Sequence, residues 1–176
     1  MEIRHFKSVS STSDKAKELA NAGYIPWTTI VAEEQTDGHG RKGEAWFSPK
    51  GGLYFSVILP KNSIDDLQTI TILAAFKVAK TIKESFGLEP MIKLPNDVLI
   101  NDKKFCGILT ENIIIGDKVK LSVIGIGINT NIDKFPESLK DIATSVKIEA
   151  NREIDNQILL NKILEELKNQ FNTINQ

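Results

Sequence analysis

Two long β-rich segments separated by a short turn constrain the fold more than any other feature of this sequence. Residues 105–115 and 120–128 are rich in isoleucine, valine and other strand-forming residues, and Gly116-Asp117-Lys118 lies between them. Glycine and aspartate favour the tight turn that joins two antiparallel strands. We therefore predict a β-hairpin here, and with it a β-sheet at the centre of the fold.

Other segments add strands and helices around this hairpin. Runs of β-branched, aromatic or apolar residues predict further strands at residues 28–32, 53–59, 91–94 and 98–100. Apolar residues at helical spacing predict helices at residues 14–22, 64–86 and 158–171. The Ser11 to Asp14 spacing resembles a capping box at the first of these helices. We expect an α/β fold of the α+β type, a mixed β-sheet covered by helices, whose strand order the sequence does not fix.

Length, charge and cysteine content bound the possible functions. A chain of 176 residues forms one domain by default, and a domain of this size buries about 70% of the surface of its unfolded chain. The net charge of -1 gives no electrostatic reason to expect nucleic-acid binding. The single cysteine, Cys106, forms no internal disulfide, and the sequence shows neither a secretory signal nor a run of about 18 apolar residues. We expect one domain over residues 1–176, in the cytoplasm, with neither nucleic acid nor a membrane as partner.

The segment 35–52, QTDGHGRKGEAWFSPKGG, joins two predicted strands and is the most loop-like part of the chain. It combines three glycines with two cations and a tryptophan, namely Gly38, Gly40, Gly43, Arg41, Lys42 and Trp46. Glycine permits close approach of the backbone to an anion, and the cations stand beside it. The segment can therefore close over a phosphate-bearing ligand, although an ordinary surface loop has the same composition. It is not a P-loop, because the Gly-Lys-Ser/Thr ending is absent.

The segment 93–109, KLPNDVLINDKKFCGIL, places Pro95 and Asn96-Asp97 between two predicted strands, followed by Lys103-Lys104. An Asn-Asp pair at a turn is usually only turn chemistry, and the two lysines can be a solvated pair in a hairpin.

The segment 123–131, VIGIGINTN, alternates Gly125 and Gly127 with isoleucine along a predicted strand. Glycine weakens strand packing, so alternate glycines on one face indicate something lying flat against that face. A β-bulge or a close helix crossing would explain them equally well.

In order and spacing, these segments resemble the catalytic domain of biotin protein ligases. The patterns Ser-Thr-Asn, GRGRxGRxW-SP-G, KWPND, GKKxxGIL and GIGIN of that family stand here as Ser11-Thr12-Ser13, GHGRKGEAWFSPKGG, KLPND, DKKFCGIL and GIGINTN. The resemblance covers about residues 5–170. It implies the biotin–lipoate ligase catalytic fold, which is similar to that of class II aminoacyl-tRNA synthetases.

The resemblance also implies roles for individual residues. The catalytic residues would be Lys104, between the biotin carboxylate and the α-phosphate, and Arg41. The biotin-binding residues would be Ser11, Thr12, Ser13, Gln35, Gly38, Arg41, Lys104, Gly107, Leu109, Gly125 and Gly127. The residues at ATP or the adenylate would be His39, Arg41, Trp46, Lys93, Asn96, Asp97 and Asn129. No metal-ligand set is predicted, and Mg²⁺ would bind through the ATP phosphates.

The implied reaction has two steps. Biotin attacks the α-phosphate of ATP to give biotinyl-5'-AMP and pyrophosphate, and a lysine of a biotin carboxyl carrier protein then takes the biotin. Because an anion attacks an anion in the first step, Lys, Arg and Mg²⁺ are needed where negative charge builds up. Closure of the glycine-rich segment would exclude water from the anhydride. The resemblance further implies that the protein can form a homodimer.

The chain departs from the family pattern at three places. His39 and Glu44 stand where arginine is usual, and Glu44 puts an anion beside the phosphates. Ser13 replaces the usual asparagine at a helix start, where serine can still cap. At the ends, we expect neither a DNA-binding domain before the Ser-Thr motif nor the small C-terminal β-barrel domain of other family members, so a repressor role is not expected.

Two other functions compete with this one. Lipoate or octanoyl transfer belongs to enzymes of a related fold, but the motifs favour biotin. Cys106 lies in a predicted strand, where a small cysteine is usually a packing residue and not an acyl-carrying nucleophile. A protein that binds biotin or biotinyl-adenylate without catalysis is the other alternative, favoured by Glu44 and by the expectation of a short C-terminus.

Overall fold

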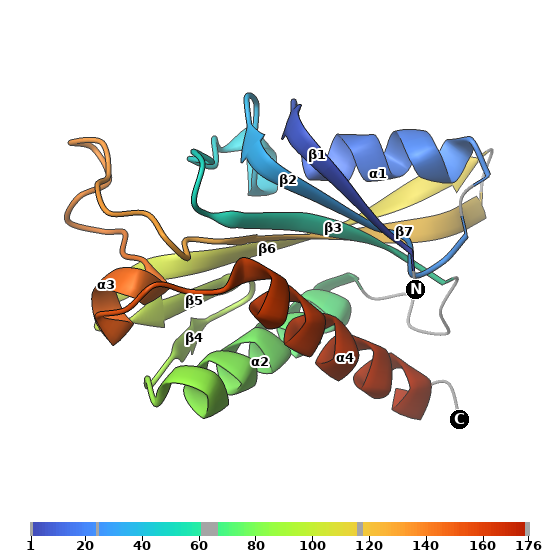
Figure 1. The fold of residues 1–176 in the computed structure, drawn as a ribbon. Coiled ribbons are helices and arrows are strands. Elements are labelled where there is room, and N and C mark those ends of the chain that lie inside the picture. Colours follow the sequence, from blue (N-terminus) through green and yellow to red (C-terminus); the bar gives the residue numbers. More distant parts are fainter. Residues whose placement is uncertain (1, 24, 61–66, 116–117, 175–176) are drawn as a thin grey trace.

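A seven-stranded mixed β-sheet organises the molecule, and helices lie against both of its faces (Figure 1). The computed structural model describes residues 2–23, 25–60, 67–115 and 118–174. The strands are β1 Ile3–Val9, β2 Thr29–Gln35, β3 Leu53–Leu59, β4 Met91–Lys93, β5 Asp97–Ile100, β6 Lys103–Ile115 and β7 Lys118–Ile128, arranged in the order β1-β2-β3-β7-β6-β5-β4. The helical elements are α1 Thr12–Asn21, the 3-10 turn η1 Arg41–Gly43, α2 Leu67–Phe86, α3 Val146–Ala150 and α4 Asn156–Ile174. The predicted fold class is confirmed.

The predicted hairpin forms the middle of the sheet. β6 and β7 pair antiparallel from Cys106 opposite Ile128 to Ile115 opposite Lys118. Lys118 of the predicted turn is the first residue of β7, whereas the turn residues Gly116 and Asp117 lie outside the described residues. β7 also pairs with β3, so its isoleucines and its glycines face opposite sides of a sheet that continues beyond it in both directions.

β1, α1 and β2 form a parallel unit at one edge of the sheet. β1 pairs parallel with β2, and α1 connects them on one face. α1 begins at its predicted cap, because Ser11 Oγ accepts hydrogen bonds from the backbone N–H groups of Ser13 and Asp14 at 3.2 and 3.4 Å. Its buried alanines, Ala16 and Ala20, belong to a small core with Ile30, Ile58 and Val123. This packing holds the first turn of α1 over the middle of the sheet.

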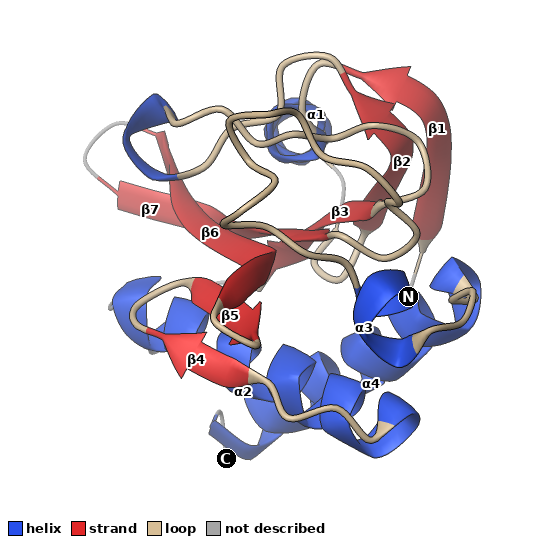
Figure 2. Ribbon diagram, turned by 90° about the vertical axis from the view of Figure 1, so that its left-hand side faces the viewer, coloured by secondary structure: helices blue, strands red, loops and turns tan. Residues whose placement is uncertain are grey.

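The main core lies on the opposite face, under α2 and α4 (Figures 1 and 2). Residues Ile124, Ile126 and Ile128 of β7 belong to it, and so do Phe55 and Phe105 of β3 and β6. The rings of Trp27 and Phe171 meet edge to face with their centroids 5.7 Å apart. The α1 face carries the small apolar core under α1 and, beside it, polar residues and the glycines of β6 and β7.

The structure adds elements that the sequence did not predict. β1 was not expected, because only part of its surface is buried and its apolar residues do not alternate cleanly. α3 is only five residues long and was not expected either. The predicted start of α2 at Ile64 lies outside the described residues. Within the described residues the helix begins at Leu67. Among the described residues, no helix is long and apolar enough to cross a membrane.

Candidate active site

A cavity of about 240 Å³ lies on the α1 face of the sheet, between the start of α1, the segment 38–46 and strands β6 and β7. We call the segment 38–46 the glycine-rich loop. The cavity is lined by the predicted residues Ser11, Thr12, Ser13, Gln35, His39, Arg41, Trp46, Asn96, Asp97, Lys104, Gly107, Leu109, Gly125 and Gly127. Residues that are far apart in the sequence therefore converge on one site. A second hollow, of about 460 Å³ between β1, β2 and α4, contains none of the predicted residues.

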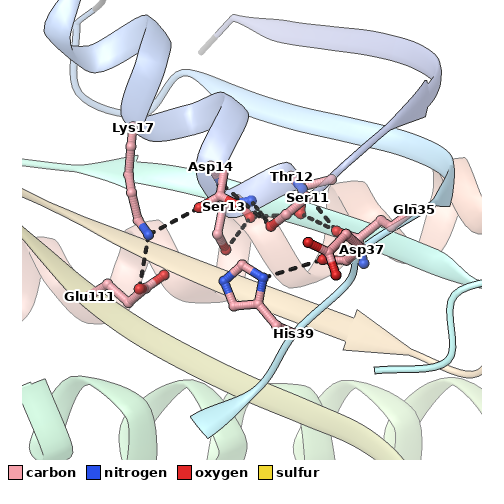
Figure 3. Close-up of polar contacts among 10 residues, drawn as sticks. Ser11, Thr12, Ser13, Asp14, Lys17, Gln35, Asp37, His39 and Glu111 are labelled. Carbon is pink, nitrogen blue, oxygen red and sulfur yellow. Dashed lines mark hydrogen bonds and ion pairs between the residues drawn. The ribbon is translucent and has the colours of Figure 1, made fainter. Parts of the chain in front are cut away.

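One end of the cavity is polar and uncharged, and it is built by the start of α1 and the end of β2 (Figure 3). The backbone N–H and the hydroxyl of Thr12 both donate to Gln35 Oε1, at 2.8 and 3.1 Å. Ser11 Oγ accepts the two hydrogen bonds that cap α1, and its hydroxyl group donates to no described residue. This end can therefore both donate hydrogen bonds to a ligand and accept them.

The floor of the cavity is the glycine face of β6 and β7. A Cβ atom on Gly125 would lie 2.4 Å from Ser13 Oγ, so only glycine leaves room for that hydroxyl. A Cβ atom on Gly127 would lie 2.4 Å from Trp46 Nε1, and one on Gly107 would lie 3.0 Å from Trp46 Cζ3. The flat group that lies against Gly127 and its cross-strand neighbour Gly107 is thus the indole of Trp46, whereas Gly125 makes room for Ser13.

The glycine-rich loop is folded back on itself by backbone hydrogen bonds. Gly40 N–H donates to the Glu44 carbonyl at 2.7 Å, and Trp46 N–H donates to the Gly38 carbonyl at 2.7 Å. At its tip, Lys42 and Gly43 both have positive φ, which glycine adopts freely and lysine does not. The loop presents Trp46 to the sheet and carries Arg41, Lys42 and Glu44 at the mouth of the cavity.

Lys104 lies at the charged end of the cavity. Its Nζ is 2.7 Å from Asp97 Oδ1, in an ion pair whose alignment is poor for a hydrogen bond, and 5.1 Å from the centre of the Trp46 ring. Its backbone N–H donates to the Ile142 carbonyl at 2.8 Å, and its carbonyl accepts from Thr144 N–H at 3.0 Å. Both the backbone and the ammonium group are therefore held in place at the cavity.

Arg41 joins the glycine-rich loop to the β4–β5 turn. Its Nη1 donates to Asn96 Oδ1 at 3.4 Å, a long hydrogen bond between two predicted site residues. Arg41, Lys42 and Lys104 give this end positive charge, which Asp97 and Glu44 partly offset. An anion placed here would meet several cations and would compete with Asp97 for Lys104.

Three predicted residues lie outside the cavity lining. Lys93 is exposed on β4 at the sheet edge. Asn129 is buried, and its Nδ2 donates to the Thr144 carbonyl at 3.0 Å. Gly38 is also buried, and a Cβ atom there would lie within 2.9 Å of Ser48 Oγ, Gln35 Nε2 and the Trp46 carbonyl oxygen. Ligand contacts by these three residues stay predictions, and the structure gives Asn129 and Gly38 packing roles of their own.

Sequence reasoning missed two buried serines beside the cavity. Ser56 is fully buried on β3 and donates to Thr12 Oγ1 at 2.8 Å. Ser48 follows the glycine-rich loop and accepts from Gln35 Nε2 at 2.8 Å. A serine inside the otherwise apolar strand LYFSVIL was the signal that could have found Ser56, because a buried hydroxyl needs a partner.

An ion cluster lies beyond the polar end of the cavity. Figure 3 shows Lys17 of α1 between Asp14 and Glu111, with Nζ–O distances of 3.2 and 2.9 Å. Burial of Lys17 opposes its charge, but the hydrogen bonds and charges of Glu111 and Asp14 prevail and raise its pKa. In the same view His39 Nδ1 lies 3.3 Å from the Asp37 carbonyl oxygen. The cluster fixes α1 on β6 next to the cavity.

Cys106 is placed as a packing residue. It has no exposed surface and belongs to the main core under α2 and α4, on the face of β6 opposite the cavity. Burial raises the pKa of its thiol strongly, so the reactive thiolate is disfavoured. A cysteine-based acyl transfer would need a thiolate that faces the cavity.

The chain has a mixed sheet with helices on both faces and a glycine-floored cavity with one polar and one cationic end. This arrangement has the chemistry to hold a small polar molecule beside an anion. Residues 5–129 match the biotin/lipoate A/B protein ligase family. The chain belongs to this family.

Individual relatives agree with the family match. The chain is 44% identical over 160 residues to the bifunctional ligase/repressor BirA of Bacillus subtilis, covering 89% of this chain and 49% of the relative. It is 33% identical over 122 residues to the biotin–[acetyl-CoA-carboxylase] ligase of Paracoccus denitrificans, covering 68% and 50%. The chain thus spans about half the length of these relatives.

A solved structure shows the same fold. The biotin protein ligase of Aquifex aeolicus in complex with biotin and ATP superimposes with a TM-score of 0.88 at 31% sequence identity. The match covers 99% of this chain and 72% of the other. The described architecture is therefore the catalytic fold of biotin protein ligases.

Proposed function

We propose that the chain is a biotin protein ligase. It would join biotin to ATP as biotinyl-5'-AMP, releasing pyrophosphate, and then transfer biotin to a lysine of a biotin carboxyl carrier protein. One observation carries the proposal: an uncharged hydrogen-bonding end and a cationic end face the same cavity across a glycine floor. Biotin has a neutral cyclic urea at one end and a carboxylate at the other.

The polar end fits a cyclic urea by its unused hydrogen-bonding capacity. Ser11 has a hydroxyl hydrogen to give, and Gln35 Nε2 keeps one N–H after its bond to Ser48. Thr12 Oγ1 donates to Gln35 and accepts from Ser56, which leaves one lone pair. Two donors suit the urea carbonyl, and an acceptor suits a ring N–H.

The cationic end fits attack of a carboxylate on a phosphate. Both reactants are anions, so bringing them together costs electrostatic energy that fixed cations offset. Lys104 would leave Asp97 for the incoming oxygens, and Arg41 would approach from the glycine-rich loop. The electron pair of the biotin carboxylate forms the new bond to phosphorus, and pyrophosphate leaves with the pair of the bond that breaks.

In the second step the neutral amine of the carrier lysine forms a bond to the biotinyl carbonyl carbon. The carbon–oxygen bond to the phosphate breaks, AMP leaves with its electron pair, and the nitrogen loses a proton to solvent. Water would compete with that amine, so the loop and the Trp46 indole would shield the anhydride. Among the described residues, no three His, Cys, Asp or Glu side chains cluster as a metal site. Mg²⁺ would arrive on the ATP phosphates, where it usually binds, with carboxylates such as Asp97 available to it.

The test is pyrophosphate release from ATP and Mg²⁺ with and without biotin, with a carrier protein in a parallel reaction. Lys104→Ala should reduce release by about a hundredfold or more, the usual effect of removing a charge-stabilising donor. Lys103→Ala is the matched control, because Lys103 precedes Lys104 on the same strand and does not line the cavity.

Each of the other possible results would indicate a different function for this chain. Biotin binding in calorimetry without pyrophosphate release would leave a non-catalytic biotin-binding protein. A chain that ignores biotin but takes up lipoate or an octanoyl group would be the acyltransferase alternative. Release that survives Lys104→Ala would remove Lys104 from the reaction.

We also propose that the protein can form a homodimer. β1 and β4 are the two edges of the described sheet, and exposed edges are usually covered in solution. A sedimentation coefficient of a monomer at all concentrations would exclude the dimer.

A further inference from the structure

A chain of hydrogen bonds leads from the cavity into the glycine-rich loop. Ser13 Oγ lies 3.1 Å from Ser56 Oγ, and Ser56 donates to Thr12 Oγ1 at 2.8 Å. Thr12 donates to Gln35 Oε1 at 3.1 Å, and Gln35 Nε2 donates to Ser48 Oγ at 2.8 Å. Ser48 Oγ then donates to the backbone carbonyl of Trp46 at 2.9 Å. We call this sequence of contacts the polar chain.

The polar chain has a fixed direction. A hydroxyl has one hydrogen, so Ser56, Thr12 and Ser48 can each donate only once. The backbone N–H of Thr12 also donates to Gln35 Oε1, at 2.8 Å, so the oxygen of the Gln35 amide must face α1 and the nitrogen must face Ser48. Ser48 accepts from that nitrogen, and its own hydrogen is free for Trp46. The start of α1 therefore determines how the loop is held.

Gly38 provides the space for the last two links of the chain. The three atoms nearest to a Cβ on Gly38 would be Ser48 Oγ at 2.6 Å, Gln35 Nε2 at 2.8 Å and the Trp46 carbonyl oxygen at 2.9 Å. Those are Ser48 Oγ itself and the two atoms that it links. Any side chain at position 38 would push them apart.

The last residue of the polar chain, Trp46, contacts the charged end of the cavity. Trp46 covers Gly107 and Gly127, and Lys104 Nζ lies 5.1 Å from the centre of its ring. The indole Nε1 is buried and donates to no described residue, so no hydrogen bond of its own holds the ring in place. Apart from packing, Trp46 depends on its backbone for its position.

We propose that Ser48 is a positioning residue that couples Gln35 in the cavity to Trp46 over the glycine floor. A ligand that engages Gln35 would thereby stabilise the placed indole, and the placed indole would stabilise Lys104. The coupling to a biotin ligand rests on the proposed function, whereas the placement of Trp46 by Ser48 belongs to the ligand-free protein.

The test uses Trp46 fluorescence in the full chain with Trp27→Phe, so that Trp46 is the only tryptophan. Ser48→Ala should make Trp46 several-fold more accessible to acrylamide quenching without ligand. It should also weaken biotin binding by about tenfold, because it leaves the part-buried Gln35 Nε2 and Trp46 carbonyl without their Ser48 partner. Gly38→Ala should have the same two effects, because its Cβ atom would push apart the atoms that Ser48 links.

Ser122→Ala is the matched control. Ser122 is a buried serine of β7 whose hydroxyl donates to Asn112 Oδ1 at 2.7 Å, outside the cavity. Its loss should lower the Tm and leave quenching unchanged. If Ser48→Ala lowers the Tm but quenches like Ser122→Ala, Ser48 is only structural and the proposal is overturned. If the native chain binds no biotin, the proposed function fails, and the quenching comparison still decides the role of Ser48.

Discussion

At the scale of single residues, the site shows glycine making room for neighbouring side chains. Gly127 and Gly107 accommodate the indole of Trp46, and Gly125 accommodates the hydroxyl of Ser13. The sequence led us to expect a flat ligand on this face, and in the structure a flat protein side chain covers part of it. A bound ligand would therefore lie beside Trp46 or displace it.

Glu44 gives the first prediction at this scale. It lines the cavity on the same loop as Arg41, where the family pattern has arginine. A charge reversal a few ångström from a phosphate is worth at most a few kcal/mol at an effective dielectric of about 20, and salt reduces it. We expect Glu44→Arg to lower the KM for ATP, or to slow adenylate loss, by up to about tenfold.

Steady-state kinetics and filter retention of the adenylate measure the two effects. Glu44→Gln separates the loss of the negative charge from the gain of a positive one and should give roughly half of the change in free energy. If Glu44→Arg changes neither the ATP requirement nor the leakage of the adenylate, the idea that Glu44 weakens ATP binding is wrong.

Most cavity residues could be predicted because each lies in a motif whose residue types are unusual for mere packing. Lys104, Gly107 and Gly125 are examples, and all line the cavity. Ser56 could not be assigned, since its role depends on which strand lies beside α1, and strand order is a long-range property. Asn129 shows another limit: its Nδ2 donates to the Thr144 carbonyl, a partner from a later segment that the motif alone does not indicate, and its contact with a ligand stays a prediction.

At the scale of elements, ion pairs between side chains stabilise the edge of the α2–α4 contact. Glu166 of α4 accepts hydrogen bonds from Lys80 at 2.8 Å and from Lys77 at 3.3 Å, both on α2. The hydrogen bond from Lys80, and then that from Lys77, lower the pKa of Glu166 against the effect of its burial. The same bond raises the pKa of Lys80.

The pH dependence of this contact follows from those directions. Because the pKa of Glu166 is lower in the folded state, its contribution is complete above the unfolded value of about 4.3 and is lost as the pH falls through the folded value. The Glu166 side chain is 26% exposed, so solvent weakens the pair. We expect Glu166→Gln to lower the Tm by up to about 3 °C at pH 7 and to lower it by less near pH 3.

Thermal melts at both pH values measure this prediction. Glu165→Gln removes the same charge from the adjacent, exposed position of α4 and should have less effect at pH 7. Equal losses for the two variants would mean that net charge and not the contact with α2 is responsible.

The elements themselves were predictable to the degree that they bury a regular apolar pattern. The β6–β7 hairpin and α2 follow clear patterns, and α1 also has a capping serine. β1 is an edge strand whose residues are only partly buried, so its sequence lacks that pattern. β2 extends to Gln35, beyond its apolar part, because β1 pairs with it up to that residue. Pairing across a sheet is a tertiary effect that overrides local preference.

At the scale of the whole molecule, the cavity joins two halves of the sheet. β1, β2 and β3 with α1 supply Ser11, Thr12 and Gln35, and β4 to β7 supply Lys104 and the glycine floor. The halves meet within the sheet along the β3–β7 pairing. A ligand in the cavity would bridge them and resist their separation.

This arrangement predicts strong stabilisation by biotin. A ligand at about 100 times its Kd adds about 2.7 kcal/mol to the free energy of unfolding, which raises the Tm of a chain of this size by about 5–10 °C. We expect such a shift in differential scanning calorimetry with biotin. Octanoate is the control ligand and should give none, because it has no urea ring for the polar end; an equal shift with octanoate would favour the acyltransferase alternative.

The β3–β7 pairing also has a consequence for synthesis on the ribosome. β3 at residues 53–59 can pair with β2 as soon as it emerges, but β7 at residues 118–128 emerges only after α2 and the β4–β6 strands. Until β7 is synthesised, one edge of β3 therefore stays unpaired, and an unpaired strand edge can pair with the wrong strand or with another chain. The residues of the polar end of the cavity are synthesised early and its glycine floor last. A ligand of the cavity therefore cannot assist folding until Gly127 has left the ribosome.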